Sequence, residues 1–241
     1  MEASLYMATA AQRVMDKQLE VIANNIANSN TVGYRAESVQ FQQLVSSATS
    51  DQLNFPAVGD LYTSQEQGTT SETANPLDLA IVGRGYFAIQ TDAGLAYTRD
   101  GRLKVSNIGE LTSIEGHPVL DAGGAAILLP NPDIVPEIHS DGRIEANGRV
   151  IGNIGVFDLT NEDIESRIGN SAFLAKADPP AIVPGRETKV QQGFLENSNV
   201  VAIRELANLI QITKSFDSAF KVVEEADSTI GKSISELGRT S

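Results

Sequence analysis

The two ends of this 241-residue chain carry apolar residues alternately three and four positions apart, which is the spacing of a helix that packs lengthwise on another helix. Near the N-terminus, where residues 3–28 contain neither Gly nor Pro, the repeat uses Leu5, Ala8, Met15, Leu19, Ile22 and Ile26. Near the C-terminus it uses Ala202, Leu206, Leu209, Phe216, Phe220, Val223, Ile230, Ile234 and Leu237. A single helix of this kind leaves an apolar stripe in water, so we expect the two ends to pair with each other or with neighbouring copies.

The middle of the chain has the pattern of a compact antiparallel sheet or a small barrel. Strand-favouring residues flank the Asp-Gly pairs at 100–101 and 141–142, and an Asn-Gly pair follows at 147–148. Each of these dipeptides is a strong signal for a tight hairpin turn. A helical bundle is the simplest alternative for the two ends, but a bundle needs more helices than the chain supplies, so neighbouring molecules are expected to provide them.

The expected fold is therefore α+β, with long N- and C-terminal helices that pair as a coiled coil and a central antiparallel β domain. The expected division is an N-terminal helix over residues 1–35, an extended connector over 36–75, the β domain over 76–175, a return connector over 176–198 and a C-terminal helix over 199–241.

Composition excludes several classes of function. The chain has 18 basic and 31 acidic residues, so its net charge of −13 argues against nucleic acid and anionic lipid as partners. Cysteine is absent and His117 and His139 are the only histidines, which disfavours thiolate or histidine-rich metal sites and histidine-dependent triads. No stretch approaches the roughly 20 apolar residues of a membrane helix, and no cleavable signal is recognised. We expect no catalytic residue, cofactor, metal or membrane insertion.

Two enzyme-like patterns fail in their context. Residues 83–88 fit a dinucleotide-binding pattern, but the following residues predict a strand where that site needs a helix, so a bend between two strands is expected. Residues 226–233 fit a loosened phosphate-loop pattern, yet they lie inside the C-terminal repeat and predict helix interior. Paired carboxylates remain as an alternative. On that alternative the chain is a β-rich carbohydrate-active or sugar-binding module, dimerised by its helices, that uses Asp100 or Asp141.

Residues 23–35 read Ala-Asn-Asn-Ile-Ala-Asn-Ser-Asn-Thr-Val-Gly-Tyr-Arg, and Asn is a poor helix former in such numbers. This run closely resembles the signature of the rod, hook and hook-associated axial proteins of the bacterial flagellum. Residues 75–81 (Asn-Pro-Leu-Asp-Leu-Ala-Ile), 97–101 (Tyr-Thr-Arg-Asp-Gly) and 193–200 (Gly-Phe-Leu-Glu-Asn-Ser-Asn-Val) resemble further elements of that family, so the resemblance covers essentially the whole chain. Its length and order best suit the proximal-rod members, with distal-rod members as the alternative.

The resemblance implies a structural protein that is exported by the flagellar type III apparatus and assembles in the periplasm as part of the basal-body rod. Its partners would be copies of itself, adjacent rod subunits and the export apparatus, and its task would be to transmit torque from motor to hook. The assembly interface would comprise the helix residues Leu5, Met15, Leu19, Ile22 and Ile26, the signature residues Asn24, Asn25, Asn28, Asn30 and Gly33, and the C-terminal residues Leu206, Leu209, Phe216, Phe220, Val223, Ile230, Ile234 and Leu237.

Overall fold

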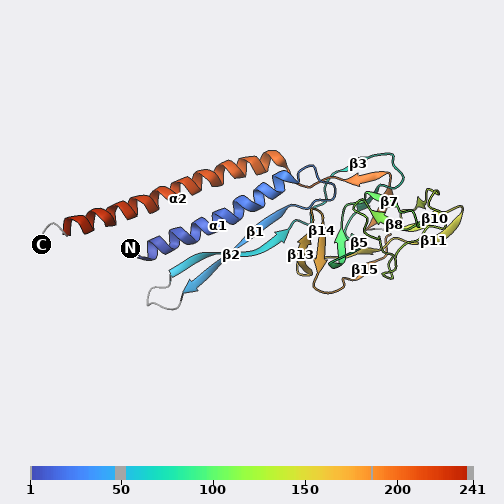
Figure 1. Ribbon diagram of the computed structural model, residues 1–241, viewed down its shortest axis with the longest axis horizontal. Coiled ribbons are helices and arrows are strands. Elements are labelled where there is room, and N and C mark those ends of the chain that lie inside the picture. Colours follow the sequence, from blue (N-terminus) through green and yellow to red (C-terminus); the bar gives the residue numbers. More distant parts are fainter. Residues whose placement is uncertain (1, 47–52, 186, 238–241) are drawn as a thin grey trace. The chain divides into compact units, whose positions relative to one another are not determined.

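The computed structural model describes residues 2–46, 53–185 and 187–237, with side-chain surroundings for 9–40, 59–185, 187–221, 224 and 228 (Figure 1). The chain divides into two compact units. The helix–hairpin unit takes residues 1–27, 37–64 and 201–241, and the β unit takes residues 28–36 and 65–200.

The helix–hairpin unit contains helix α1 (Glu2–Ala27), strands β1 (Glu37–Ser46) and β2 (Leu53–Thr63), and helix α2 (Ala202–Leu237). The strands form an antiparallel hairpin whose register runs from Glu37 opposite Thr63 to Ser46 opposite Leu53. Helix α1 contacts α2 and both strands (Figure 1). A two-stranded ribbon is marginally stable alone, so packing against α1 stabilises it.

The predicted fold class is wrong, because the two terminal helices do not pair as a coiled coil. On α2, Leu206 is 47% exposed and Phe220 is 53% exposed, although the predicted coiled coil would bury both. On α1, Val14 and Val21 are buried although neither belongs to the apolar repeat that predicted the coiled coil. Met15 and Leu19, which do belong to it, are only half-buried. The physical reason is the β1–β2 hairpin, which gives α1 a second surface to pack on, so the packing of α1 is divided between α2 and the hairpin.

The described chain is instead rich in strands, and fifteen of them lie in the β unit. They are β3 (Thr70–Glu72), β4 (Leu79–Val82), β5 (Tyr86–Thr91), β6 (Gly94–Thr98), β7 (Leu103–Val105), β8 (Leu111–Ser113), β9 (Glu137–Ile138), β10 (Arg143–Ala146), β11 (Arg149–Asn153), β12 (Val156–Phe157), β13 (Ile164–Ile168), β14 (Ala172–Ala175), β15 (Ala181–Ile182), β16 (Lys189–Gln192) and β17 (Phe194–Glu196). A six-stranded sheet has the order β13-β14-β6-β5-β12-β15, and a three-stranded sheet has the order β11-β10-β9. The pairs β16–β4, β17–β3 and β7–β8 complete the unit, and every pairing between strands is antiparallel.

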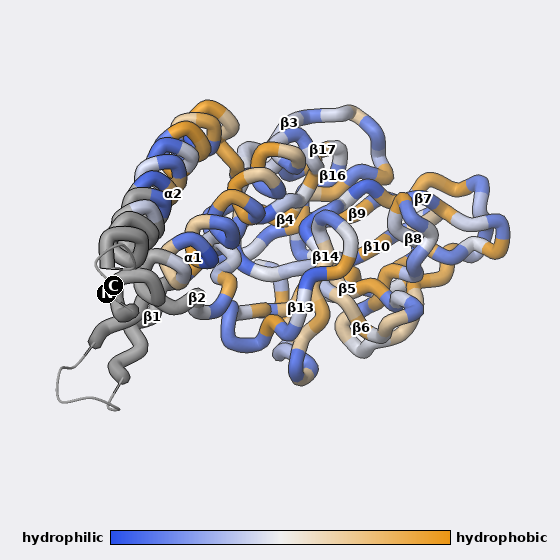
Figure 2. Tube along the Cα trace, turned by 60° about the vertical axis from the view of Figure 1, so that its left-hand side comes forward, coloured by the Kyte–Doolittle hydropathy of each residue, from blue (hydrophilic) through white to orange (hydrophobic). Residues whose placement is uncertain are grey.

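Strand β5 of the six-stranded sheet is buried on both faces. Alternate side chains of a strand point to opposite faces, and in β5 Phe87 and Ile89 join one apolar cluster while Tyr86 and Ala88 join another. The continuous apolar run of β5 follows from this double burial, and Figure 2 shows apolar residues along β5 and its neighbour β6.

The predicted tight turns have different outcomes. Residues 147–148 connect β10 and β11 with φ of 52° at Asn147 and 70° at Gly148, which is a two-residue hairpin turn. Residues 100–101 connect strands of different sheets, because β6 pairs with β5 and β14 while β7 pairs with β8. The Gly101 carbonyl accepts the N–H of Leu79 at 2.9 Å, and a Cβ at Gly101 would lie 1.7 Å from the Leu79 carbonyl oxygen. Glycine is needed at 101 for this close backbone approach.

Candidate functional site

The Asn-rich end of α1 is anchored to the start of β1. The buried carboxamide of Asn25 donates to the Glu37 carbonyl at 2.8 Å and accepts the Glu37 N–H at 3.0 Å. A carboxamide presents a donor and an acceptor side by side, as a peptide group does, so it can bond both backbone groups of one residue. This contact explains an Asn that helix propensity alone disfavours.

After α1 the chain turns sharply. The Thr31 N–H bonds the Asn28 carbonyl at 3.1 Å, and the Thr31 hydroxyl donates to the Asn28 side chain at 3.0 Å. Gly33 has φ of +69°, and its N–H donates to the Glu196 carbonyl at 2.8 Å. A Cβ at Gly33 would lie 2.4 Å from the Arg99 carbonyl carbon, so both the conformation and the space require glycine.

A buried ion cluster lies next to this turn in the β unit. The Glu196 carboxylate pairs with Arg35 at 2.8 Å through one oxygen and with Arg99 at 2.8 Å through the other. Their side chains are 1%, 1% and 3% exposed for Glu196, Arg35 and Arg99. The Gly68 N–H also donates to Glu196, at 3.1 Å. The three charges come from three motifs of the sequence, residues 23–35, 97–101 and 193–200, which fold onto one another here.

Two cations against one carboxylate leave a positive charge in the interior, and backbone carbonyls compensate it. Arg99 donates to the carbonyls of Ile81 at 3.1 Å and Gly83 at 2.7 Å, Arg35 donates to the Glu66 carbonyl, and the Arg99 guanidinium lies 5.1 Å from the Tyr86 ring centre. Burial lowers the pKa of Arg99 while Glu196 acts in the opposite direction, and burial raises the pKa of Tyr86. Removing the carboxylate would leave two buried cations without a counter-ion, which is strongly destabilising.

A second set of bonds joins the same segments. The Asn199 side chain accepts the Ala36 N–H at 2.7 Å and donates to the Glu66 carbonyl at 2.8 Å. Arg167 donates to the Arg35 carbonyl at 2.7 Å, and its guanidinium lies 4.5 Å from the Tyr34 ring centre and 4.6 Å from that of Phe173. The chain that leaves α1 and the chain that enters α2 are therefore tied together inside the β unit.

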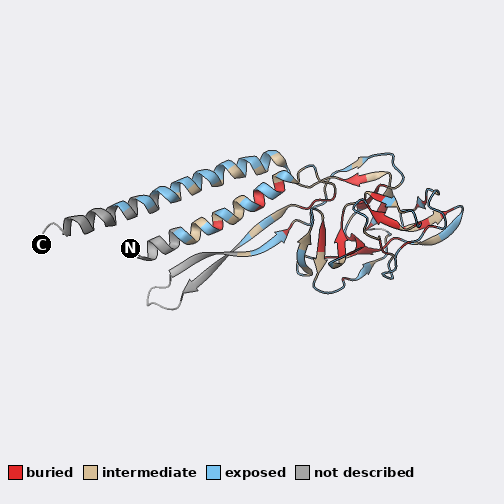
Figure 3. Ribbon diagram, viewed as in Figure 1, coloured by how far each residue is buried: buried red, intermediate tan, exposed pale blue. Residues whose placement is uncertain are grey.

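Helix α2 has an apolar arc that its own unit does not cover. Ile203 is 81% exposed, Ile210 is 57% exposed, and Leu206 and Phe220 are also exposed. Figure 3 shows that most of the described part of α2 is exposed. These positions follow one another by three, four and ten residues, so they share one side of a helix. Leu209 and Phe216 of the same helix are half-buried. We call the four exposed residues Ile203, Leu206, Ile210 and Phe220 the outer face of α2.

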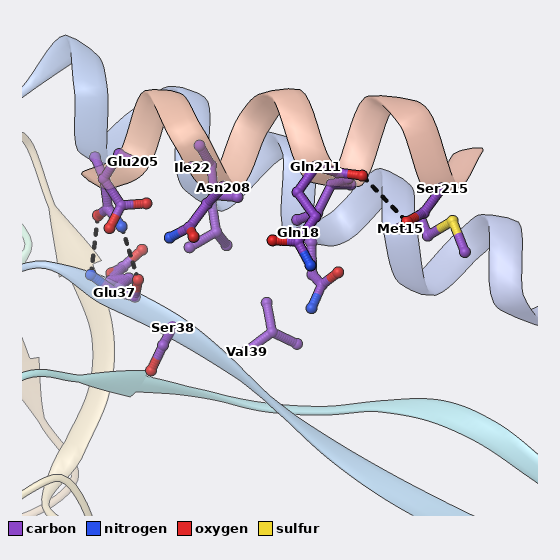
Figure 4. A pocket seen from close by; sticks show the side chains of 13 residues that line it. Met15, Gln18, Ile22, Glu37, Ser38, Val39, Glu205, Asn208, Gln211 and Ser215 are labelled. Atoms are coloured by element: carbon purple, nitrogen blue, oxygen red, sulfur yellow. Dashed lines mark hydrogen bonds between the residues drawn. The ribbon is translucent and has the colours of Figure 1, made fainter. Parts of the chain in front are cut away.

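A cavity of about 500 Å³ lies between α1, α2 and the start of β1 (Figure 4). Its lining residues are Met15, Gln18, Val21, Ile22 and Asn25 from α1, Glu37, Ser38 and Val39 from β1, and Glu205, Asn208, Gln211, Ile212 and Ser215 from α2. The helices therefore leave a groove with many polar side chains where the coiled-coil prediction expected apolar contact.

The predicted interface residues lie in different surroundings. Ile22, Asn25 and Gly33 are buried, and Met15, Leu19, Ile26, Asn28, Leu209 and Phe216 are half-buried. Asn24, Asn30, Leu206 and Phe220 are exposed. The side chains of Leu5, Val223, Ile230, Ile234 and Leu237 lie outside the described residues. Sequence reasoning did not pair Arg35, Arg99 and Glu196; the signal was present, because each charged residue stands in a motif that was singled out.

The described part of the chain offers neither a metal site nor a membrane-spanning helix. No group of three or more His, Asp or Glu side chains there is arranged to hold a metal ion. Neither helix has, over its described residues, an apolar stretch long enough to cross a membrane. Gly83 and Gly85 have φ of +100° and +113° and form a bend between β4 and β5. Residues 226–233 lie within α2.

Comparison with known proteins gives matches along the chain. Residues 5–35 match the family described as "Flagella basal body rod protein", residues 80–151 match "Flagellar hook protein FlgE/F/G D1 domain", and residues 191–236 match "Flagellar basal body rod FlgEFG protein C-terminal". The flagellar basal-body rod protein FlgF of Mesorhizobium japonicum is 39% identical to this chain. The alignment covers 100% of both chains.

Two further relatives agree with this result. FlgF of Rhizobium meliloti is 38% identical over 99% of each chain. The flagellar basal-body rod protein FlgG of Bacillus subtilis is 33% identical over 93% of this chain and 95% of its own. The resemblance is thus stronger to these two FlgF proteins than to this FlgG. Full-length identity at this level shows that the chain belongs to the family of flagellar basal-body rod proteins.

Proposed function

We propose that this chain is a structural subunit of the flagellar basal-body rod that joins neighbouring rod subunits through the outer face of α2. The single observation that supports this contact surface is the exposure of four apolar side chains on one side of a long helix, namely Ile203, Leu206, Ile210 and Phe220. Burying one such side chain contributes about 1.5–3 kcal/mol. A face of this kind on a protein that belongs to a multi-subunit structure is most simply explained by a partner that covers it.

The remaining predicted interface residues divide into two roles in this proposal. Asn24 and Asn30 lie at the surface, while buried Asn25 and Gly33 shape the chain that presents the interface. The partners are copies of this chain or adjacent rod subunits, and a contact repeated along a screw axis builds a continuous tube. Such a tube carries torque from motor to hook. Export through the flagellar type III apparatus and assembly in the periplasm are part of the proposal, and catalysis, a cofactor and a metal are not.

The test is a charge on the outer face of α2, read out as motility. Leu206→Asp combined with Ile210→Asp is expected to abolish swimming in soft agar and to remove the chain from isolated basal bodies. Both residues are exposed in the chain, so the purified variant should keep its far-UV circular dichroism and protease resistance. Ser218→Asp places a charge on another exposed part of the same helix and is the matched control, which should swim. Normal motility of the double variant would overturn the proposed contact surface.

A further inference from the structure

The outer edge of β1 faces the cavity between α1, α2 and the hairpin. Asn25 bonds both the N–H and the carbonyl of Glu37, and both residues line the cavity. Glu37 and Val39 are labelled on β1 in Figure 4. The other edge of β1 pairs with β2. The N–H and carbonyl of Glu37 that bond Asn25 therefore point away from β2, toward the edge of β1 that has no neighbouring strand in the described structure. At this residue the Asn25 carboxamide substitutes for the peptide group of a further strand.

Val39 is the next residue along the same edge. In an antiparallel pair the backbone N–H and C=O groups of successive residues alternate between the two edges, so Val39 directs its groups to the same side as Glu37. Val39 lines the cavity, and among the residues that the structure describes, none outside β2 is hydrogen-bonded to it. An edge with unused backbone groups beside a groove accepts an extended peptide as an added strand.

The sequences of the two strands differ in how they protect their edges. Residues 38–46 of β1 contain no Pro, Gly or charged residue. Strand β2 contains Pro56 and Asp60, and the register shifts between Val39 and Phe41, so a bulge falls on the hairpin there. Proline, charge and bulges hinder strand pairing at an edge. The edge of β1 is thus the one suited to pairing.

The walls of the cavity indicate the chemistry of the added segment. Gln18, Asn208 and Gln211 can donate to and accept from a peptide backbone of any sequence. The apolar lining residues Met15, Val21, Ile22 and Ile212 favour an apolar side chain beside it. Glu37 and Glu205 are the charged lining residues, and both are acidic, so a Lys or Arg on the segment is complementary.

We propose that the cavity receives an extended segment of a neighbouring rod subunit, which adds to the edge of β1 at Val39 and places a Lys or Arg near Glu37 and Glu205. The inference rests on the proposed function, because it requires rod neighbours. It adds a second contact, made by backbone groups, to the one made by the apolar outer face of α2.

Site-specific photo-crosslinking in assembled basal bodies separates the two claims. A short diazirine amino acid at Asn208 probes the cavity, and the same group at Leu206 probes the outer face of α2. We expect both to crosslink to a rod protein, and the peptide attached at 208 to carry a Lys or Arg. A crosslink at 206 with none at 208 to another subunit would overturn the strand addition while leaving the proposed function in place. No intersubunit crosslink at either site would overturn both.

The backbone bond is tested by Val39→Pro, with Val39→Ala as the matched control. Proline removes the outward N–H of residue 39 and leaves the bonds to β2, so the variant should fold. We expect Val39→Pro to lose the 208 crosslink and to keep the 206 crosslink, whereas Val39→Ala keeps both. An undiminished 208 crosslink in Val39→Pro would contradict strand addition. If Val39→Pro does not accumulate in cells, the Asn208 crosslink on the unmodified strand decides the matter.

Discussion

Arg35 and Glu196 lie toward opposite ends of the sequence, yet their side chains meet at 2.8 Å, and each is only 1% exposed. Arg99 completes the cluster from the middle of the chain. Buried ion pairs between side chains of three separate sequence motifs therefore hold the β unit together. The same cluster holds together the segments that lead out of α1 and into α2.

Glu196→Gln is expected to lower the free energy of unfolding of the β unit by about 3–5 kcal/mol, because it leaves Arg35 and Arg99 buried without a counter-ion. Urea denaturation followed by fluorescence of the tyrosines measures the change. Asp158→Asn, which removes the partner of the 75%-exposed Arg84, is the matched control and should cost under about 1 kcal/mol. Equal effects of the two substitutions would show that burial of the cluster does not matter.

Gly33→Ala is expected to destabilise the β unit more than Gly169→Ala. Both glycines have positive φ, +69° and +56°, so the conformational strain of alanine is similar. A Cβ at Gly33 would lie 2.4 Å from the Arg99 backbone, whereas a Cβ at Gly169 meets nothing within 4 Å. The difference between the two variants in thermal unfolding therefore isolates the close approach. Equal melting temperatures would contradict it.

The sequence was informative where a local rule decides the structure and uninformative where distant segments meet. Residues 147–148 form the predicted turn because an Asn-Gly pair with positive φ is sufficient for it. Residues 100–101 carry an equally strong signal for a hairpin turn, but they connect β6 to β7, which lie in different sheets. There the backbone of Leu79 approaches Gly101 and bonds its carbonyl. No spacing rule pairs Arg35 with Glu196. The coiled-coil prediction failed because an apolar repeat does not reveal that strands β1 and β2 also pack against α1.

Asn25→Ala is expected to loosen the start of β1, since the backbone groups of Glu37 lose two hydrogen bonds. Hydrogen exchange of the Glu37 amide should become faster, by the equivalent of about 1 kcal/mol. Asn24→Ala, one position earlier and exposed, should leave that amide unchanged. An unchanged exchange rate in Asn25→Ala would rule out the carboxamide as the anchor of β1.

Burial raises the pKa of Tyr97 to about 12. The phenol of the folded chain therefore holds its proton above the usual value of 10. Between pH 10 and pH 12 the folded state binds more protons than the unfolded state. The contribution of the protonated Tyr97 phenol to the free energy of unfolding is therefore fully present below pH 10 and is lost as the pH rises toward 12. Burial also raises the pKa of Tyr86, so absorbance titration should show a late tyrosinate step whose amplitude falls by one tyrosine in Tyr97→Phe. An unchanged amplitude of that step in Tyr97→Phe would contradict the raised pKa of Tyr97.

Tyr97→Phe is also expected to keep or raise stability at neutral pH. The Tyr97 hydroxyl is buried, and no hydrogen-bond partner for it lies among the described residues. Removing an unsatisfied polar group from an apolar surrounding is neutral or favourable. Thermal unfolding at pH 7 measures the effect, and a clear loss of stability would mean that the hydroxyl is satisfied in solution.

The central claim is that the outer face of α2 joins rod subunits. A cryo-electron microscopy map of basal bodies, isolated from the strain that carries this chain, tests it most directly. The account predicts that the chain lies in the rod with Ile203, Leu206 and Ile210 buried against another rod subunit. A map in which the chain occupies the rod while these three side chains face solvent would contradict it.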